Sequence, residues 1–271
     1  MSTHFLVQQI KKTSSSFFVG VSIAIGMITP ILLTSSRALA GYAYTNIPIN
    51  AGNEIKTLNN QSIYPKIIAF TPNGGYAILY GKNNYYTSNI PQKALNALST
   101  LNKQGSIINT IAFTPKGEWV IIYNNNGVYW SPNLPQDVKD ELVKINQQNL
   151  NINNVAFTPN GAWVIIANNG YNAYWSYNLP LVVINEIKTI FKKYSIQSVT
   201  FAPNGGWGII YNAGSNFSSS NIPPQLAQII NQNLQLSNHP LDVAFTLTNG
   251  WVLVYALIYY KPAYNPQQFP F

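Results

Sequence analysis

The chain has 271 residues, with 15 lysines and arginines against seven acidic residues and no cysteine, which gives a formal net charge of +8. The lack of cysteine excludes a disulfide scaffold and a lipid-anchored lipoprotein. After residue 40 there is no arginine, the residue that nucleic-acid binding proteins use for bidentate contacts to phosphate and guanine. We therefore expect no nucleic-acid partner.

The first 40 residues carry the three parts of a secretory signal peptide. Two lysines precede an apolar stretch over residues 17–33, and Ala38-Leu39-Ala40 supplies a small-x-small cleavage site. Cleavage after Ala40 predicts a secreted, periplasmic or cell-surface protein that begins at Gly41 and keeps no membrane span. The alternative is an uncleaved anchor, but a span needs about twenty apolar residues and this stretch is broken by glycines and a proline.

One short sequence motif is then repeated five times. Its opening phenylalanines stand 43, 44, 44 and 44 residues apart. Six residues after each of them comes a large aromatic residue, and between the two lies Thr-Pro-Asn-Gly or a close variant. The five pairs are Phe70 and Tyr76, Phe113 and Trp119, Phe157 and Trp163, Phe201 and Trp207, and Phe245 and Trp251. A fixed period of this length predicts an array of like units.

The elements of one unit are best seen over residues 84–123. An aromatic and β-branched run over 85–88 predicts a strand, and the proline of Asn-Ile-Pro predicts a helix start. Leucines at helical spacing over 92–103 predict the helix itself. A buried strand over 107–113, a tight turn and a strand over 119–123 complete the unit. The predicted order is strand, helix, strand, strand.

The other units follow the same plan. Helix prolines and hairpin glycines recur at the expected places, Asn-Gly being the pair that best tolerates a tight hairpin. Five complete units fill residues 41–255, and a Tyr- and Pro-rich tail occupies 256–271. No unit has the polar outer face of a capping repeat, and a ring leaves no exposed ends. We predict an α+β repeat protein, a closed five-unit propeller; the alternative is a five-bladed β-propeller with outer helices.

Three resemblances accompany this repeat. Residues 155–166, Val-Ala-Phe-Thr-Pro-Asn-Gly-Ala-Trp-Val-Ile-Ile, are similar to the first hairpin of Trp-Asp repeat propeller blades, although no Trp-Asp pair is present and a helix replaces the fourth strand. The unit order resembles the pentein, or α/β-propeller, fold, which implies a pseudo-fivefold ring. The Phe-Thr-Pro-x-Gly-x-Trp … Asn-Ile-Pro pattern resembles repeats of uncharacterised secreted bacterial proteins and covers residues 41–255.

Catalytic and metal-binding groups are scarce. The cysteine mechanism of pentein enzymes is excluded because there is no cysteine. After residue 40 the only histidine is His239, which we expect in an exposed loop and which cannot form a zinc site alone. A hydrolase acting on envelope polymers would need two acids, for which Glu118 and Asp242 are candidates. No acid recurs between units, so we expect no metal, no cofactor and no catalytic residue.

Aromatic residues recur before each helix. Four residues ahead of each Asn-Ile-Pro or Asn-Leu-Pro asparagine stands an aromatic side chain, in order Tyr42, Tyr85, Tyr129, Tyr174 and Phe217. The next residue is also aromatic in three units: Tyr86, Trp130 and Trp175. Adjacent strand residues point to opposite faces. We therefore expect the first set to pack under the helices, and the second set to be exposed or to line a groove at equivalent positions.

These aromatics predict a binding surface. Flat rings stack on sugars while amides meet hydroxyl groups, and asparagines crowd the neighbouring loops, Asn84, Asn126 and Asn172 among them. The alternative is that the asparagines only form turns. The leading interpretation is a secreted, non-enzymatic module that binds glycans through these aromatic and asparagine residues. The second is a structural or protein-interaction scaffold of the cell envelope, with an envelope protein as partner.

Overall fold

A computed structural model describes residues 39–257. The predicted signal peptide over 1–40 lies outside these residues except for its last two positions, and so does the chain beyond Leu257. Both therefore stay predictions. Within the described part of the chain, no helix is long and apolar enough to cross a membrane.

The described residues form five helices and fifteen strands, and they follow the predicted order of strand, helix, strand, strand in each unit. The helices are α1 (Ile49–Asn60), α2 (Gln92–Lys103), α3 (Gln136–Gln147), α4 (Leu181–Ile190) and α5 (Pro224–Gln235). The strands are β1 (Leu39–Thr45), β2 (Pro65–Phe70), β3 (Tyr76–Tyr80), β4 (Asn84–Ser88), β5 (Ile108–Phe113), β6 (Trp119–Tyr123), β7 (Gly127–Trp130), β8 (Ile152–Phe157), β9 (Trp163–Ala167), β10 (Asn172–Trp175), β11 (Ile196–Phe201), β12 (Trp207–Tyr211), β13 (Asn216–Ser220), β14 (His239–Phe245) and β15 (Trp251–Leu257).

The strands form five antiparallel sheets of three. The first to fourth sheets are β2-β3-β4, β5-β6-β7, β8-β9-β10 and β11-β12-β13. The fifth sheet is β1-β15-β14, in which β1 pairs with β15 from Leu39 opposite Leu257 to Thr45 opposite Trp251. Each sheet thus takes its third strand from the following sequence unit, and the last sheet takes it from the first unit.

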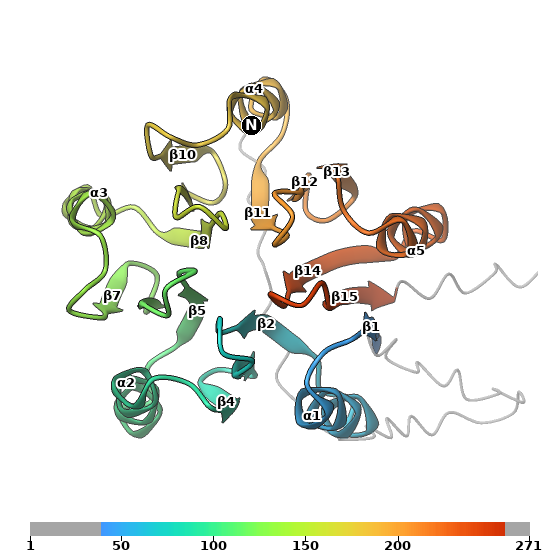
Figure 1. The fold of residues 1–271 in the computed structure, drawn as a ribbon, viewed down its shortest axis with the longest axis horizontal. Coiled ribbons are helices and arrows are strands. Elements are labelled where there is room, and N and C mark those ends of the chain that lie inside the picture. The colour runs from blue at the N-terminus through green and yellow to red at the C-terminus, as the bar shows by residue number, and fades with distance from the viewer. Residues whose placement is uncertain (1–38, 258–271) are drawn as a thin grey trace, which may run out of the picture. The chain divides into compact units, whose positions relative to one another are not determined.

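The sheets are arranged like propeller blades, with hairpins toward a common centre and helices outside (Figure 1). Contacts run from β2 through β5, β8 and β11 to β14, and β14 also contacts β2. Apolar clusters fill the spaces between neighbouring sheets. One of them joins the second and third sheets to α3, whose predicted stripe Val138, Leu142 and Ile145 is fully buried. Middle strands are apolar on both faces because a sheet packs on each side of them.

Prolines begin the helices as predicted, but the turns before them are of two lengths. Pro48, Pro91 and Pro223 follow short turns, Thr/Ser-Asn-Ile-Pro, whose asparagines adopt positive φ angles of 50–56°. Pro135 and Pro180 follow turns one residue longer, Ser-Pro-Asn-Leu-Pro and Ser-Tyr-Asn-Leu-Pro. Repeat counting from these prolines is therefore offset by one residue in the second and third sheets.

Each short turn is matched by a glycine in the facing hairpin. A Cβ on Gly75, Gly206 or Gly250 would lie 2.0–2.2 Å from the carbonyl oxygen of the turn asparagine. The sheets with longer turns carry Glu118 and Ala162 at this position. The close approach of the short turn therefore explains the glycine.

Gly206→Ala should lower the free energy of unfolding by roughly 1–3 kcal/mol, because the added methyl group overlaps the oxygen of Asn221. Urea denaturation would measure it. Inserting one residue between Ser220 and Asn221, which copies the longer turn, should restore most of the lost stability. If the insertion gives no recovery, the proposed match between turn length and glycine is wrong.

Candidate functional site: an axial pocket and an adjoining groove

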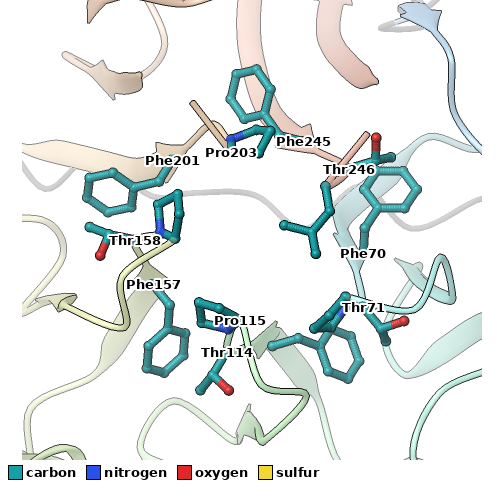
Figure 2. A pocket seen from close by; sticks show the side chains of 14 residues that line it. Phe70, Thr71, Thr114, Pro115, Phe157, Thr158, Phe201, Pro203, Phe245 and Thr246 are labelled. Carbon is teal, nitrogen blue, oxygen red and sulfur yellow. The ribbon is translucent and has the colours of Figure 1, made fainter. Parts of the chain in front are cut away.

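The five turns that begin at the repeated phenylalanines, three of them Phe-Thr-Pro, meet at the centre and enclose a cavity of about 100 Å³ (Figure 2). The phenylalanine rings surround it, while Pro115 and Pro203 lie nearer its middle. Leu247 replaces proline in the fifth sheet and is half exposed. The lining consists of Phe70, Thr71, Pro72, Phe113, Thr114, Pro115, Phe157, Thr158, Pro159, Phe201, Pro203, Phe245, Thr246 and Leu247.

The side chains that line the pocket are mainly apolar, and the threonine hydroxyl groups among them are engaged in hydrogen bonds within the protein. The hydroxyl oxygen of Thr71 accepts a hydrogen bond from the Gly75 amide at 2.8 Å, and that of Thr246 accepts one from Gly250 at 2.8 Å. Thr158 does the same for the hairpin of the third sheet. These bonds pair the amide groups of the tight hairpins, and they direct the hydroxyl groups away from the centre, as Figure 2 shows.

A second cavity, of about 260 Å³, adjoins the axial pocket between the hairpins of the third and fourth sheets. The two share Thr158, Pro159, Phe201 and Pro203, and the second continues to Asn160, Asn178, Pro180, Asn204 and Gly205. We call this second cavity the groove. Unlike the axial pocket, it is lined by residues of two neighbouring units only.

Two asparagine side chains in the groove are free. Asn160 and Asn178 are exposed, and within residues 39–257 their amides make no hydrogen bond. Asn204, in contrast, accepts from the Gly206 amide at 2.9 Å and donates to the Asn221 carbonyl at 3.0 Å. The free amides can therefore donate to and accept from a ligand without breaking a bond in the protein.

Apolar side chains surround the outer end of the groove. Tyr177 is 97% exposed, and Leu181 and Val182 are exposed in the first turn of α4, directly after Pro180. The first turns of α2 and α3 begin instead with Gln92 and Gln136. Only beside the groove, among these three helices, does the helix start present two exposed apolar residues, a composition typical of contact surfaces.

The predicted aromatic set Tyr86, Trp130 and Trp175 is not equivalent in the structure. Trp130 lies opposite Val120 and Trp175 opposite Val164, the second residue of each middle strand, but Tyr86 lies opposite Ile78, the third residue. The expected equivalence is wrong because the longer turns shift the second and third units by one residue. Tyr86 therefore faces the opposite side of its sheet from the two tryptophans.

These three residues are all partly buried and none of them lines the pocket or the groove. Tyr86 stacks on Tyr80 with ring centroids 5.0 Å apart. Trp130 packs against the core cluster that contains α3, and Trp175 packs against the one that contains α4. The Lys188 ammonium lies 5.8 Å from the centroid of the Trp175 ring.

The predicted asparagines lie at the other ends of these strands: Asn84 and Asn172 are the first residues of β4 and β10, and Asn126 directly precedes β7. Asn126 donates to the side chain of Asn149 at 3.1 Å, and Asn172 accepts from Asn168 at 3.1 Å. Asn84 is exposed, and its side chain makes no hydrogen bond within residues 39–257. Several neighbouring asparagines have positive φ angles. Most of these amides therefore stabilise turns, as the alternative interpretation has it.

The candidate catalytic groups are not brought together. Glu118 lies in the hairpin of the second sheet, where it accepts a hydrogen bond from the Thr114 hydroxyl group. Asp242 is buried in the fifth sheet, and the second and fifth sheets are not neighbours. His239 is not in a loop as expected: it is the first residue of β14 and pairs with Ala256. Among the described residues no three histidine or acidic side chains gather as a metal site would require.

The similarity of this chain to known proteins is weak. No protein-family model matches the chain, and no curated protein matches it. A solved structure described as "YCF48 bound to D1 peptide" is 13% identical over 70% of this chain and 60% of that one, with a TM-score of 0.28. Another, "Structure of Dos1 propeller", is 13% identical over 59% and 46%, with a TM-score of 0.26. The chain thus spans less than two thirds of either.

Proposed function

We propose that this protein is a non-enzymatic binding module that holds an extended, uncharged peptide segment across the axial pocket and the groove. The observation that carries the proposal is the continuity of a pocket lined mainly by phenylalanine and proline with a groove that has two free amides. One apolar side chain of the peptide enters the pocket, and the neighbouring peptide groups bond to Asn160 and Asn178. A partner of the cell envelope, expected from the predicted export, would present such a segment.

A peptide suits this lining better than a glycan does. The axial pocket has about the volume of one side chain. Burying apolar surface there gains about 25 cal/mol per Å². A sugar would instead leave hydroxyl groups against phenylalanine and proline carbons without hydrogen-bond partners. Stacking of glycans on Tyr86, Trp130 and Trp175 stays a prediction.

We further propose that the five sheets form a closed ring, as predicted from the repeat. Three contacts of the fifth sheet with the first unit support it: β1 pairs with β15, β14 contacts β2, and the Asp242 carboxylate accepts from the Ile68 amide at 2.8 Å. An internal junction has the same bond, since Asn154 accepts from the Val199 amide at 3.0 Å. A closed ring gives the axial pocket all five of its sides.

The test is selection of ligands by the exported chain, 41–271, from a random peptide library, with a glycan array in parallel. We expect peptides with an apolar residue flanked by uncharged ones. Leu247→Asp should weaken their binding by tenfold or more, because the peptide would have to bury its apolar group against a charge. Leu236→Asp is the control, since Leu236 is also an exposed leucine but lies at the C-terminal end of α5, outside the pocket and the groove.

Asn178→Ala should weaken binding less, by about fivefold for one hydrogen bond of about 1 kcal/mol. Fluorescence anisotropy with a selected peptide would measure all three variants. Peptides that bind Leu247→Asp as well as the unchanged chain would place the site elsewhere. Glycans bound in place of peptides, with Trp130 and Trp175 required, would support the other interpretation.

A further inference from the structure

The junction between the fifth and first sheets differs chemically from the other junctions. We call it the seam. Its inner part is formed by β14 and β2, and its outer part by α1 packed between the two sheets. Two carboxyl groups lie there. Asp242 is buried on β14, and Glu54 of α1 forms a hydrogen bond with the Tyr76 hydroxyl group, which belongs to the first sheet.

Neither carboxyl group has a cationic partner. Within residues 39–257 the ion pair is that of Lys144 with Glu141 on α3, which involves neither Glu54 nor Asp242. The second oxygen of Glu54, Oε2, is buried and has no hydrogen-bond partner among the described residues. A buried carboxylate without a cation is costly, so burial favours the protonated form. It raises the pKa of Glu54, and it raises that of Asp242 to about 7 against the bonds donated by the Ile68 and Val243 amides.

The charged and titratable groups on the elements around Asp242 do not offset this cost. The strands and helix that pack on β14 are β15, β2, β11, α5 and β12. They carry Lys66 on β2, Tyr211 on β12 and Tyr255 on β15, whereas β11 and α5 have no charged residue. His239 lies on β14 itself. The ammonium of Lys66 is directed to the carbonyl groups of Lys82 and Ile108, toward the second sheet.

We propose that the seam is a pH-sensitive joint, held shut by the protonated carboxyl groups and loosened when they ionise. The same strands lead into the axial pocket, since Asp242 is three residues from Phe245 and Ile68 is two residues from Phe70. Loosening the seam therefore opens one side of the pocket. This consequence for binding rests on the proposed function, but the joint itself does not.

The sign follows from proton linkage. The closed seam binds the Asp242 proton up to a pH of about 7, whereas a hydrated aspartate releases it near its ordinary value of 3.8. Between these values the closed state holds more protons than the open one, so rising pH favours opening, by at most tenfold per pH unit for one group. Above about 7 the effect levels off.

Amide hydrogen exchange gives a direct test at two matched positions. Ile68 donates to Asp242 across the seam, and Val199 donates to Asn154 across an internal junction. We expect the protection factor of the Ile68 amide, measured by NMR on the exported chain, to fall at least tenfold from pH 5 to pH 8. That of Val199 should not change. Equal behaviour of the two amides would overturn the proposal.

Two substitutions exchange the roles. Asp242→Asn keeps the acceptor oxygen that Asn154 provides naturally, and should remove the pH dependence at Ile68. Asn154→Asp should create one at Val199, a result that does not depend on the first variant folding well. Pocket binding of a selected peptide should weaken from pH 5 to pH 8 in the unchanged chain but not in Asp242→Asn. If no peptide binds at all, the exchange data still decide the joint, and only the proposed function fails.

Discussion

A chain that begins at Asn46, without β1, should fail to show the cooperative unfolding transition of a chain that begins at Leu39. The strand β1 supplies seven residue pairs to β15 and places Tyr42 and Tyr44 on the cluster that joins the fifth and first sheets. Its removal leaves an apolar strand, β15, with an unpaired edge, which favours aggregation. Circular dichroism during heating, with size-exclusion chromatography, would show the loss.

Two controls give this experiment its meaning. A chain that begins at Gly41 loses only the pairs of Leu39 and Ala40, and should unfold in one step like the longer chain. A synthetic peptide of residues 39–47 added to the shortened chain should restore the transition, because it can pair with β15. A shortened chain that unfolds as cooperatively as the full one would contradict both the role of β1 and the closed ring.

The double substitution Trp130→Ala with Trp175→Ala should destabilise the protein strongly. Each indole packs on a different core cluster, so each loss should cost about 2–4 kcal/mol and the two should add. The sum is a large part of the 5–15 kcal/mol that stabilises a typical domain. Tyr177→Ala, at the most exposed aromatic position, should change the stability by less than about 0.5 kcal/mol. A double variant as stable as the unchanged chain would mean that these rings are free to bind a ligand.

The fold was predictable from the sequence because the repeat fixes many things at once. The Asn-Gly turns, the helix prolines and the spacing of Val138, Leu142 and Ile145 each point to one unit plan. The repeat period alone does not reveal the extra residue in two of the turns. Because of this residue, side chains at the same distance before the helix proline face opposite sides of their sheets. The signal was present: Gly75, Gly206 and Gly250 occur only with the short turns, while Glu118 and Ala162 accompany the longer ones.

The candidate site was harder to predict for a different reason. The Phe-Thr-Pro motif predicts a turn in each unit. That these turns come together around one pocket depends on the arrangement of all five sheets. The groove depends on Asn160 and Asn178, which look like ordinary turn residues. Only their lack of hydrogen-bond partners separates them from Asn126 and Asn172, and that requires the three-dimensional structure.

If the chain is exported as predicted, the pairing of β1 with β15 also sets an order of events for that process. The predicted cleavage point, between Ala40 and Gly41, lies inside β1, where both residues are opposite partners in β15. A peptide bond in a paired strand is not open to a protease. Signal removal would therefore have to come before the last strand joins the first, and a chain that folds too early would keep its leader. Since β15 is synthesised after the other strands of residues 39–257, its late arrival leaves the necessary interval.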